Sequence, residues 1–182
     1  MKKLVALSAI GKDQPGIVAA LAKVLFEKGC NLEDSSMTRL KGDFAVLLLI
    51  SLPESLGLEE LKAALQGVAQ VKSLNVALRP LSGEEAAASP GKGTLAYTLV
   101  VYGVDHPGIV YRVTQAAADL GANITDLRTH VTMSGSTPLY SLAVELEMPG
   151  PSVVESFQKK LESLKKELKV EATLNPVEAD EL

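Results

Sequence analysis

The chain contains a long internal repeat. The segment "GKDQPGIV" at residues 11–18 recurs as "GVDHPGIV" at residues 103–110, which is 92 positions further along. The same offset carries a glycine, an asparagine and an aspartate into the second copy, where Gly29, Asn31 and Asp34 recur as Gly121, Asn123 and Asp126. After four extra residues, "FAVLLLISLP" (44–53) aligns with "YSLAVELEMP" (140–149). Similarity on this scale indicates one structural unit of roughly 80–90 residues that is used twice.

The repeat predicts two small domains in this 182-residue chain. We expect the first domain at residues 1–80 and the second at residues 94–176. The segment 81–93 between them is rich in small, polar and turn-forming residues, which is typical of a flexible linker. The last residues, 177–182, form an acidic tail that we expect to fray.

Hydrophobic periodicity predicts the same order of elements in both copies. In the first copy we expect strands at 3–10, 31–40, 44–52 and 71–79, and helices at 15–28 and from Leu58 to Val68. The second copy repeats the order, with strands at 95–102, 123–132 and 139–148, a helix at 107–120 and a last helix from Ser152. This order predicts an α+β fold of two ferredoxin-like βαββαβ domains, each with an antiparallel sheet and both helices on one face.

Local signals predict how the helices begin and end. Pro15 suits a first helical turn, and Gly29 suits the stop at the other end of the same helix. Ser152 and Glu155 have the spacing of a capping box, which predicts the start of the last helix. Val153 and Phe157 begin the apolar stripe of that helix.

The strand 44–52 is apolar on both faces, whereas 140–148 alternates more regularly. A central strand that is covered by helices on one side only should alternate. We therefore expect the other face of the first sheet to be covered by the second unit, a subunit partner or a target protein.

Composition excludes several classes of protein. The net charge is −4, so neither unit offers the basic surface that nucleic-acid binding needs. A single cysteine, Cys30, excludes an internal disulfide and suits a reducing compartment. No apolar stretch approaches membrane-spanning length. We expect a cytoplasmic protein without a membrane segment, metal or cofactor.

The repeated turn carries groups that suit a small zwitterion. We expect the Asp13 carboxylate to accept from the free N–H groups of the first helical turn. Those N–H groups can also hold a ligand carboxylate, and the missing Cβ atoms of Gly11 and Gly16 allow close approach. Asn31 adds one acceptor and two donors. The same residues are equally consistent with a sharp strand-to-helix turn that binds nothing.

The order of elements, the two turn segments and the glycine–asparagine pairs resemble ACT domains, which are regulatory amino-acid-binding modules with a ferredoxin-like fold. Two such modules in tandem resemble ACT proteins of the glycine cleavage system transcriptional repressor type. The resemblance implies a ligand at the interface between modules, next to the first strand–helix turn and the start of the second strand. Carried over by position, the implied binding residues are Gly11, Asp13, Gln14, Pro15, Gly16, Ile17 and Asn31, with Gly103, Asp105, His106, Pro107, Gly108, Ile109 and Asn123.

The resemblance further implies a non-catalytic protein that signals through contact with a protein partner and not with DNA. We also expect a homo-oligomer. The alternative is a regulatory subunit of an enzyme of amino-acid metabolism, which would use the same site with a different partner. A small hydrolase that uses Lys12 or Arg112 is a third interpretation, although Asp13 would repel a phosphate. Cys30, whose repeat counterpart is Ala122, is expected to pack and not to catalyse.

Overall fold

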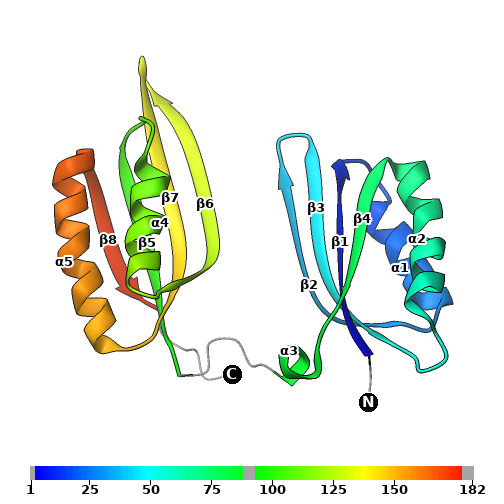
Figure 1. Ribbon diagram of the computed structural model, residues 1–182. Helices are drawn as coiled ribbons and strands as arrows, with labels where there is room; N and C mark the ends of the chain where they lie inside the picture. The colour runs from blue at the N-terminus through cyan, green and yellow to red at the C-terminus, as the bar shows by residue number, and fades with distance from the viewer. Residues whose placement is uncertain (1–2, 88–92, 178–182) are drawn as a thin grey trace. The chain divides into compact units, whose positions relative to one another are not determined.

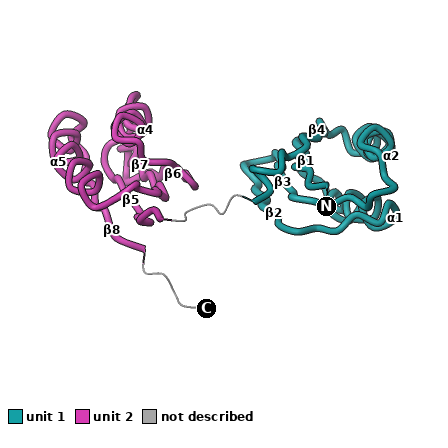
Figure 2. The backbone as a smooth tube through the Cα atoms, turned by 60° about the horizontal axis from the view of Figure 1, so that its bottom comes forward, with its two compact units in different colours: residues 1–88 teal, residues 89–182 magenta. Residues whose placement is uncertain are grey.

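The computed structural model describes residues 3–87 and 93–177. It divides into two compact units, Met1–Ala88 and Ser89–Leu182, which are coloured separately in Figure 2. Each unit is described by itself below.

Unit 1 has the predicted βαββαβ order. Its elements are β1 (Lys3–Lys12), α1 (Ile17–Glu27), β2 (Asn31–Leu40), β3 (Asp43–Leu52), α2 (Leu58–Lys72) and β4 (Leu74–Pro80). The strands pair antiparallel in the order β2-β3-β1-β4, so β2 is an edge strand. Both helices lie on one face of this sheet (Figure 1).

Unit 2 repeats this architecture. Its elements are β5 (Leu95–Val104), α4 (Ile109–Asp119), β6 (Asn123–Ser134), β7 (Thr137–Met148), α5 (Pro151–Leu168) and β8 (Val170–Pro176). The strand order β6-β7-β5-β8 matches that of unit 1, and the β6–β7 hairpin extends further than its counterpart (Figure 1). The predicted fold class is confirmed in both units.

Each unit has its own aliphatic core between the sheet and its two helices. In unit 1, Ile17, Leu21 and Leu25 recur at helical spacing on α1 and are buried against alternate residues of β1 and β3. In unit 2, Phe157 is fully buried and takes part in a core of otherwise aliphatic residues and Met148. Burial of each such side chain contributes about 1.5–3 kcal/mol relative to exposure, so these stripes hold the helices on the sheet.

The start of α5 differs from the prediction. The helix begins at Pro151 with Gly150 as the N-cap, and no side chain caps it, so the predicted capping box of Ser152 and Glu155 is wrong. Proline is favoured at the first helical position because its missing N–H would be unpaired there. The one-residue shift also buries Val154 in the core, while Val153 is only half-buried. A second proline, Pro15, precedes the N-cap Gly16 of α1 and does not lie in its first turn.

A short helix, α3 (Gly83–Ala87), lies within the segment predicted to be a flexible linker. Ser82 and Glu85 cap it reciprocally, since the Glu85 N–H donates to Ser82 Oγ and the Ser82 N–H donates to Glu85 Oε2. Arg79 donates to Glu85 Oε1 at 2.6 Å, and these hydrogen bonds lower the pKa of the Glu85 carboxyl. The rest of the predicted linker, 88–92, and the tail residues 178–182 lie outside the described residues.

Within residues 3–87 and 93–177, no helix combines the length and the apolar character that crossing a membrane requires.

Candidate functional site

The β1–α1 turn of unit 1 leaves the start of α1 open. The N-cap Gly16 has φ 84°, a left-handed conformation that glycine adopts at little cost, and no side chain caps the helix. The Ala20 N–H donates to the Gly16 carbonyl, whereas no hydrogen bond within the described residues engages the N–H groups of residues 17–19. These three donors lie at the positive end of the helix and are available to an anion.

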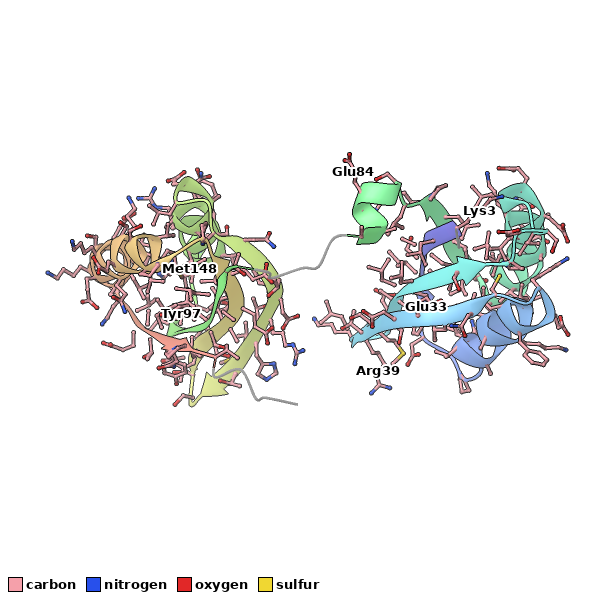
Figure 3. All side chains as sticks on the ribbon, turned by 90° about the horizontal axis from the view of Figure 1, so that it is seen from below. Lys3, Glu33, Arg39, Glu84, Tyr97 and Met148 are labelled. Atoms are coloured by element: carbon pink, nitrogen blue, oxygen red, sulfur yellow. The ribbon has the colours of Figure 1, made fainter. Side chains whose placement is uncertain are left out.

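Asp13 does not cap α1, contrary to the prediction. Its backbone N–H donates to the Gly42 carbonyl at 2.9 Å, which ties the turn to the β2–β3 hairpin. Its carboxylate accepts from Arg39 Nη1 at 3.4 Å. Figure 3 shows the Arg39 side chain projecting outward from the end of β2. The result is a partly exposed ion pair beside the open helix start.

Gln14 fixes the turn to the end of α2. Its Nε2 donates to the carbonyl of Lys72, the last residue of α2, at 2.9 Å. Lys72 Nζ donates in return to the carbonyl of Pro15 at 3.1 Å. Two hydrogen bonds therefore hold the turn on the helix that follows later in the chain.

Gly11 serves the packing of its own unit. A Cβ at this position would lie 2.7 Å from the Ser73 carbonyl oxygen and 2.8 Å from Leu74 Cδ2. The space beside Gly11 is thus filled by the start of β4, and the prediction that its missing Cβ admits a ligand is wrong. Gly103 of unit 2 is in the same position, with Val170 Cγ1 at 2.7 Å from the ideal Cβ.

A cavity of about 500 Å3 opens beside the turn of unit 1. Its lining combines the turn, the first turn of α1 and the inner side of the β2–β3 hairpin: Asp13, Gln14, Gly16, Ile17, Val18, Ala19, Met37, Arg39 and Phe44. Four of the predicted residues are brought together here, namely Asp13, Gln14, Gly16 and Ile17. The sequence interpretation missed the contribution of Met37 and Arg39. The signal was the short hairpin, because it places the last residues of β2 beside Phe44.

Asn31 lies at the opposite end of the sheet from this turn. It pairs with Ser51 near the end of β3, whereas Lys12 pairs with Asp43 at the start of β3. Its Nδ2 donates to Glu33 Oε1 at 3.2 Å, and Ser51 Oγ donates to the same carboxylate oxygen. Within one unit, therefore, Asn31 and the turn do not form a common site. Asn123, which pairs with Glu147 near the end of β7, is placed in the same way in unit 2.

The turn of unit 2 has the same backbone with different side chains. Gly108 is the N-cap of α4 with φ 103°, and Pro107 precedes it. His106 Nε2 lies 2.8 Å from the carbonyl oxygen of Leu168, the last residue of α5, and Nδ1 lies 3.0 Å from the carbonyl oxygen of Pro107. Both ring nitrogens donate only when the imidazole is protonated, and these hydrogen bonds raise the pKa of His106.

Asp105 has no counterpart of the Arg39 ion pair. Its N–H donates to the Pro138 carbonyl at 3.1 Å, as Asp13 donates to Gly42. Val131 occupies the strand position of Arg39, and Asp105 makes no ion pair with any residue in 93–177. The ion pair of Asp13 and Arg39, which forms the charged rim of the unit 1 cavity, is thus specific to unit 1.

Other candidate groups are used in packing or in ion pairs. Arg112 donates through Nε to Glu167 Oε1 at 2.9 Å, which ties α4 to α5. Cys30 is half-buried against the unit 1 core, and burial raises the pKa of its thiol, which disfavours the nucleophilic thiolate. Among residues 3–87 and 93–177, no cluster of three or more histidine, cysteine or acidic side chains is placed to hold a metal ion.

The comparison with protein families decides the identity of both units. The family model described as the ACT domain matches residues 3–78 and, again, residues 98–175. The chain belongs to the ACT domain family. Its two ACT domains follow each other in tandem, as the sequence repeat predicted.

Two curated proteins match parts of this ACT-domain chain. A UPF0237 protein of Methanopyrus kandleri is 45% identical over 49 residues, which cover 27% of this chain and 54% of the relative. The glycine cleavage system transcriptional repressor of Escherichia coli is 38% identical over 45 residues, covering 25% of this chain and 24% of the relative. The chain thus spans about half the length of the first curated relative and about a quarter of the second.

Two solved structures match almost the full length of this ACT-domain chain. One is an unknown protein from Galdieria sulphuraria, with a TM-score of 0.83, 29% identity, and coverage of 97% of this chain and 99% of the other. The other, named "putative glycine cleavage system transcriptional repressor", has a TM-score of 0.69 and 23% identity, with coverage of 97% and 98%. The chain is therefore a tandem ACT-domain protein that resembles the glycine cleavage repressors.

Proposed function

We propose that this tandem ACT-domain protein is a non-catalytic regulatory protein that binds a small amino acid at the β1–α1 turn of unit 1. The observation that carries the proposal is the cavity of about 500 Å3 into which the open first turn of α1 faces. Three N–H donors and an ion pair border it, so the cavity offers both signs of charge to a zwitterion.

The ligand carboxylate accepts hydrogen bonds from the N–H groups of Ile17, Val18 and Ala19, where the helix dipole favours an anion. The ligand ammonium lies against the carboxylate of Asp13, which at 32% exposure is the less exposed member of its ion pair with Arg39. The side chain of the ligand meets Met37 and Phe44 on the hairpin wall. An amino acid satisfies all three surfaces, and a simple carboxylate or amine satisfies only one polar surface.

A second ACT module completes the site at a module interface. Strand β2 is an edge strand, so one side of its backbone is available for pairing. If, once the ligand is bound, β2 of a second copy pairs with it antiparallel, the start of one strand lies beside the end of the other. Asn31 of the second copy then approaches the turn of the first. This arrangement gives Asn31 the role that it cannot have within its own unit.

The signal passes to a protein partner. A net charge of −4 does not favour direct contact with DNA, and a relative of this chain is named as a glycine cleavage system transcriptional repressor. We infer that ligand binding changes the affinity of the protein for a transcription factor. The test is copurification with and without the ligand: recovery of an enzyme of amino-acid metabolism instead of a transcription factor would contradict this role.

Ligand binding is tested by a thermal-shift screen of the twenty amino acids, followed by calorimetry of each hit. A ligand at a hundred times its Kd adds about 2.7 kcal/mol of stability. We expect one or a few small amino acids to bind, and Asp13→Asn to weaken them at least tenfold. The matched variant Asp105→Asn should bind like the wild type. A flat response across the panel, or equal binding by Asp13→Asn, would contradict the proposed site.

A further inference from the structure

The sheet face of unit 1 that α1 and α2 do not cover is uncharged across its middle, while Lys12 and Asp43 pair with each other in the row at one end of it. The strand register arranges twelve residues of this face in three rows across β2, β3, β1 and β4: Asp34–Leu49–Ala6–Arg79, Ser36–Leu47–Ser8–Ala77 and Thr38–Ala45–Ile10–Asn75. We call these twelve residues the uncovered face. Ile10 and Leu47 are each 54% exposed on it. Only Asp34 and Arg79 are charged, and they lie at opposite ends of one row.

The corresponding face of unit 2 carries more charge in the matching rows, although Val100 and Tyr102 are also exposed on it. Its matching rows are Asp126–Glu145–Thr98–Asn175, Arg128–Ala143–Val100–Thr173 and His130–Ser141–Tyr102–Glu171. Four of these twelve side chains are charged, and Arg128 forms an ion pair with Asp126 on the surface itself. A face of this composition is stable in water. The two units share one fold, so the apolar character of the uncovered face is not a requirement of the fold.

We propose that the uncovered face packs against the same face of a second copy of the chain. The two-fold axis of this dimer runs parallel to the strands, midway between β3 and β1. Each row of one copy therefore lies against the same row of the other copy in reverse order. Every large apolar side chain on the central strands then faces a small residue of the second copy: Leu49 faces Ala6, Leu47 faces Ser8, and Ile10 faces Ala45. Such alternation of large and small residues is what allows two sheets to interdigitate.

The two charges support the same axis. Reversal of the first row places Asp34 of each copy opposite Arg79 of the other, at both edges of the interface. A two-fold axis across the strands would instead stack Leu47 on Leu47 and leave both charges opposite neutral residues. Arg79 is 62% exposed while bound to Glu85, so it retains donors for a second carboxylate. Rim pairs of this kind add little affinity but fix the register.

The area suits a weak homodimer. Four strands spaced by about 4.8 Å and seven residues at about 3.3 Å give a face of roughly 19 Å by 23 Å. Covering it on both copies removes roughly 900 Å2 of surface, which is less than the roughly 1,200 Å2 of stable specific interfaces and is typical of weak association. The cavity beside the turn lies on the helix side of the hairpin, so this dimer leaves the proposed ligand site open. The inference therefore does not depend on ligand binding.

The test is the mass of the full chain, measured by light scattering after gel filtration without added amino acid, over about 5–100 μM. We expect the wild type to have twice the 19.2 kDa mass of the chain at the upper concentrations. Leu47→Glu should weaken dimerisation about a hundredfold, because it places a charge in the centre of an apolar interface. The matched variant Val100→Glu, at an exposed position of the corresponding face of unit 2, should remain dimeric.

The two-fold axis is tested by a charge exchange. Asp34→Lys and Arg79→Glu should each weaken the dimer about tenfold, and the double variant should restore it to within about threefold. Glu85→Gln removes the ion pair with Arg79 within unit 1, while its amide oxygen can still accept from the Ser82 N–H, and it should leave the dimer unchanged. A monomeric wild type, or a Leu47→Glu variant that stays dimeric, would overturn the interface. A double variant that is no better than the single variants would overturn the axis.

Discussion

The two strand-to-helix turns have one backbone and two sets of side-chain contacts. Each starts its helix at a left-handed glycine, with φ 84° at Gly16 and 103° at Gly108. In each, the residue two positions before that glycine contacts the last carbonyl of the second helix of its unit, through Gln14 in unit 1 and His106 in unit 2. The comparison teaches that this position has the same structural role in both units, although two different side chains perform it.

The turns diverge where a ligand would bind. In unit 1, Arg39 pairs with Asp13 on the rim of the cavity, whereas Val131 occupies the matching position in unit 2. The fold therefore requires the glycines and the contact to the helix end, since both units have them. It does not require the ion pair, which leaves that pair available for function.

The largest effect is expected from filling the space beside the first glycine of the turn. Gly11→Ala should destabilise unit 1 by about 1–3 kcal/mol, because the new Cβ meets the Ser73 carbonyl oxygen, which cannot rotate away. Gly103→Ala should cost less, because the atom that it meets first belongs to the side chain of Val170. Urea unfolding followed by far-UV circular dichroism measures both changes.

A spectroscopic feature separates the two units in this experiment. All four tyrosines belong to unit 2, so tyrosine fluorescence follows unit 2 alone: Tyr97, Tyr102, Tyr111 and Tyr140. Gly11→Ala should leave that signal unchanged. Gly42→Ala is the matched control, since a Cβ there meets nothing within 4 Å. Equal stability of Gly11→Ala and Gly42→Ala would refute the packing role of Gly11.

An intermediate effect is expected from replacing Arg39 with valine, the residue that unit 2 has at the matching position. Arg39→Val should weaken binding of the amino acid about tenfold, which is about 1.4 kcal/mol, because Asp13 loses the partner that orients its carboxylate. Calorimetry measures the change. Arg128→Val removes a similarly exposed arginine of β6 and should bind like the wild type. If both variants lose affinity equally, net charge and not the Asp13–Arg39 pair is responsible.

The smallest effect is a pH dependence that only unit 2 should show. The pKa of His106 is raised in the folded state by its hydrogen bonds to Leu168 and Pro107. Its contribution to stability is therefore fully present below the ordinary histidine pKa of about 6.5 and is lost as the pH rises through the raised value. Thermal unfolding followed by tyrosine fluorescence should show this loss in the wild type.

Exchange of the two side chains sharpens the comparison. His106→Gln should remove the loss of stability in this pH range, because an amide donates to Leu168 without titrating. Gln14→His should introduce a similar loss in unit 1, visible by circular dichroism but not by tyrosine fluorescence. An unchanged pH profile in His106→Gln would show that another group is responsible.

The repeat made the fold predictable, and packing details decided what could not be predicted. Periodicity located the long helices and the central strands, because each buries a regular apolar face, whereas no range was predicted for β8. The start of α5 was misplaced because Pro151 at the first helical position outweighed the spacing of Ser152 and Glu155. The helix α3 was missed although Ser82 and Glu85 have that same spacing, because the segment around them reads as a linker.

The site could be predicted only in part. The turn residues that line the cavity follow one another in the sequence, so the repeat identified them. Arg39 and Met37 come from a strand whose register was unknown, and their contribution needed the hairpin pairing. Asn31 was grouped with the turn by the family resemblance, but the parallel course of β1 and β2 places it at the other end of the sheet.

The most direct test of the ligand site is a map of amide chemical shifts by nuclear magnetic resonance during titration with the best amino acid of the screen. We expect the N–H resonances of Ile17, Val18 and Ala19 to shift most, because they donate to the ligand carboxylate. Those of residues 109–111, at the start of α4, should move little. If the largest shifts lie outside the unit 1 turn, or if no amide shifts at all, the proposed recognition of an amino acid by the start of α1 is contradicted.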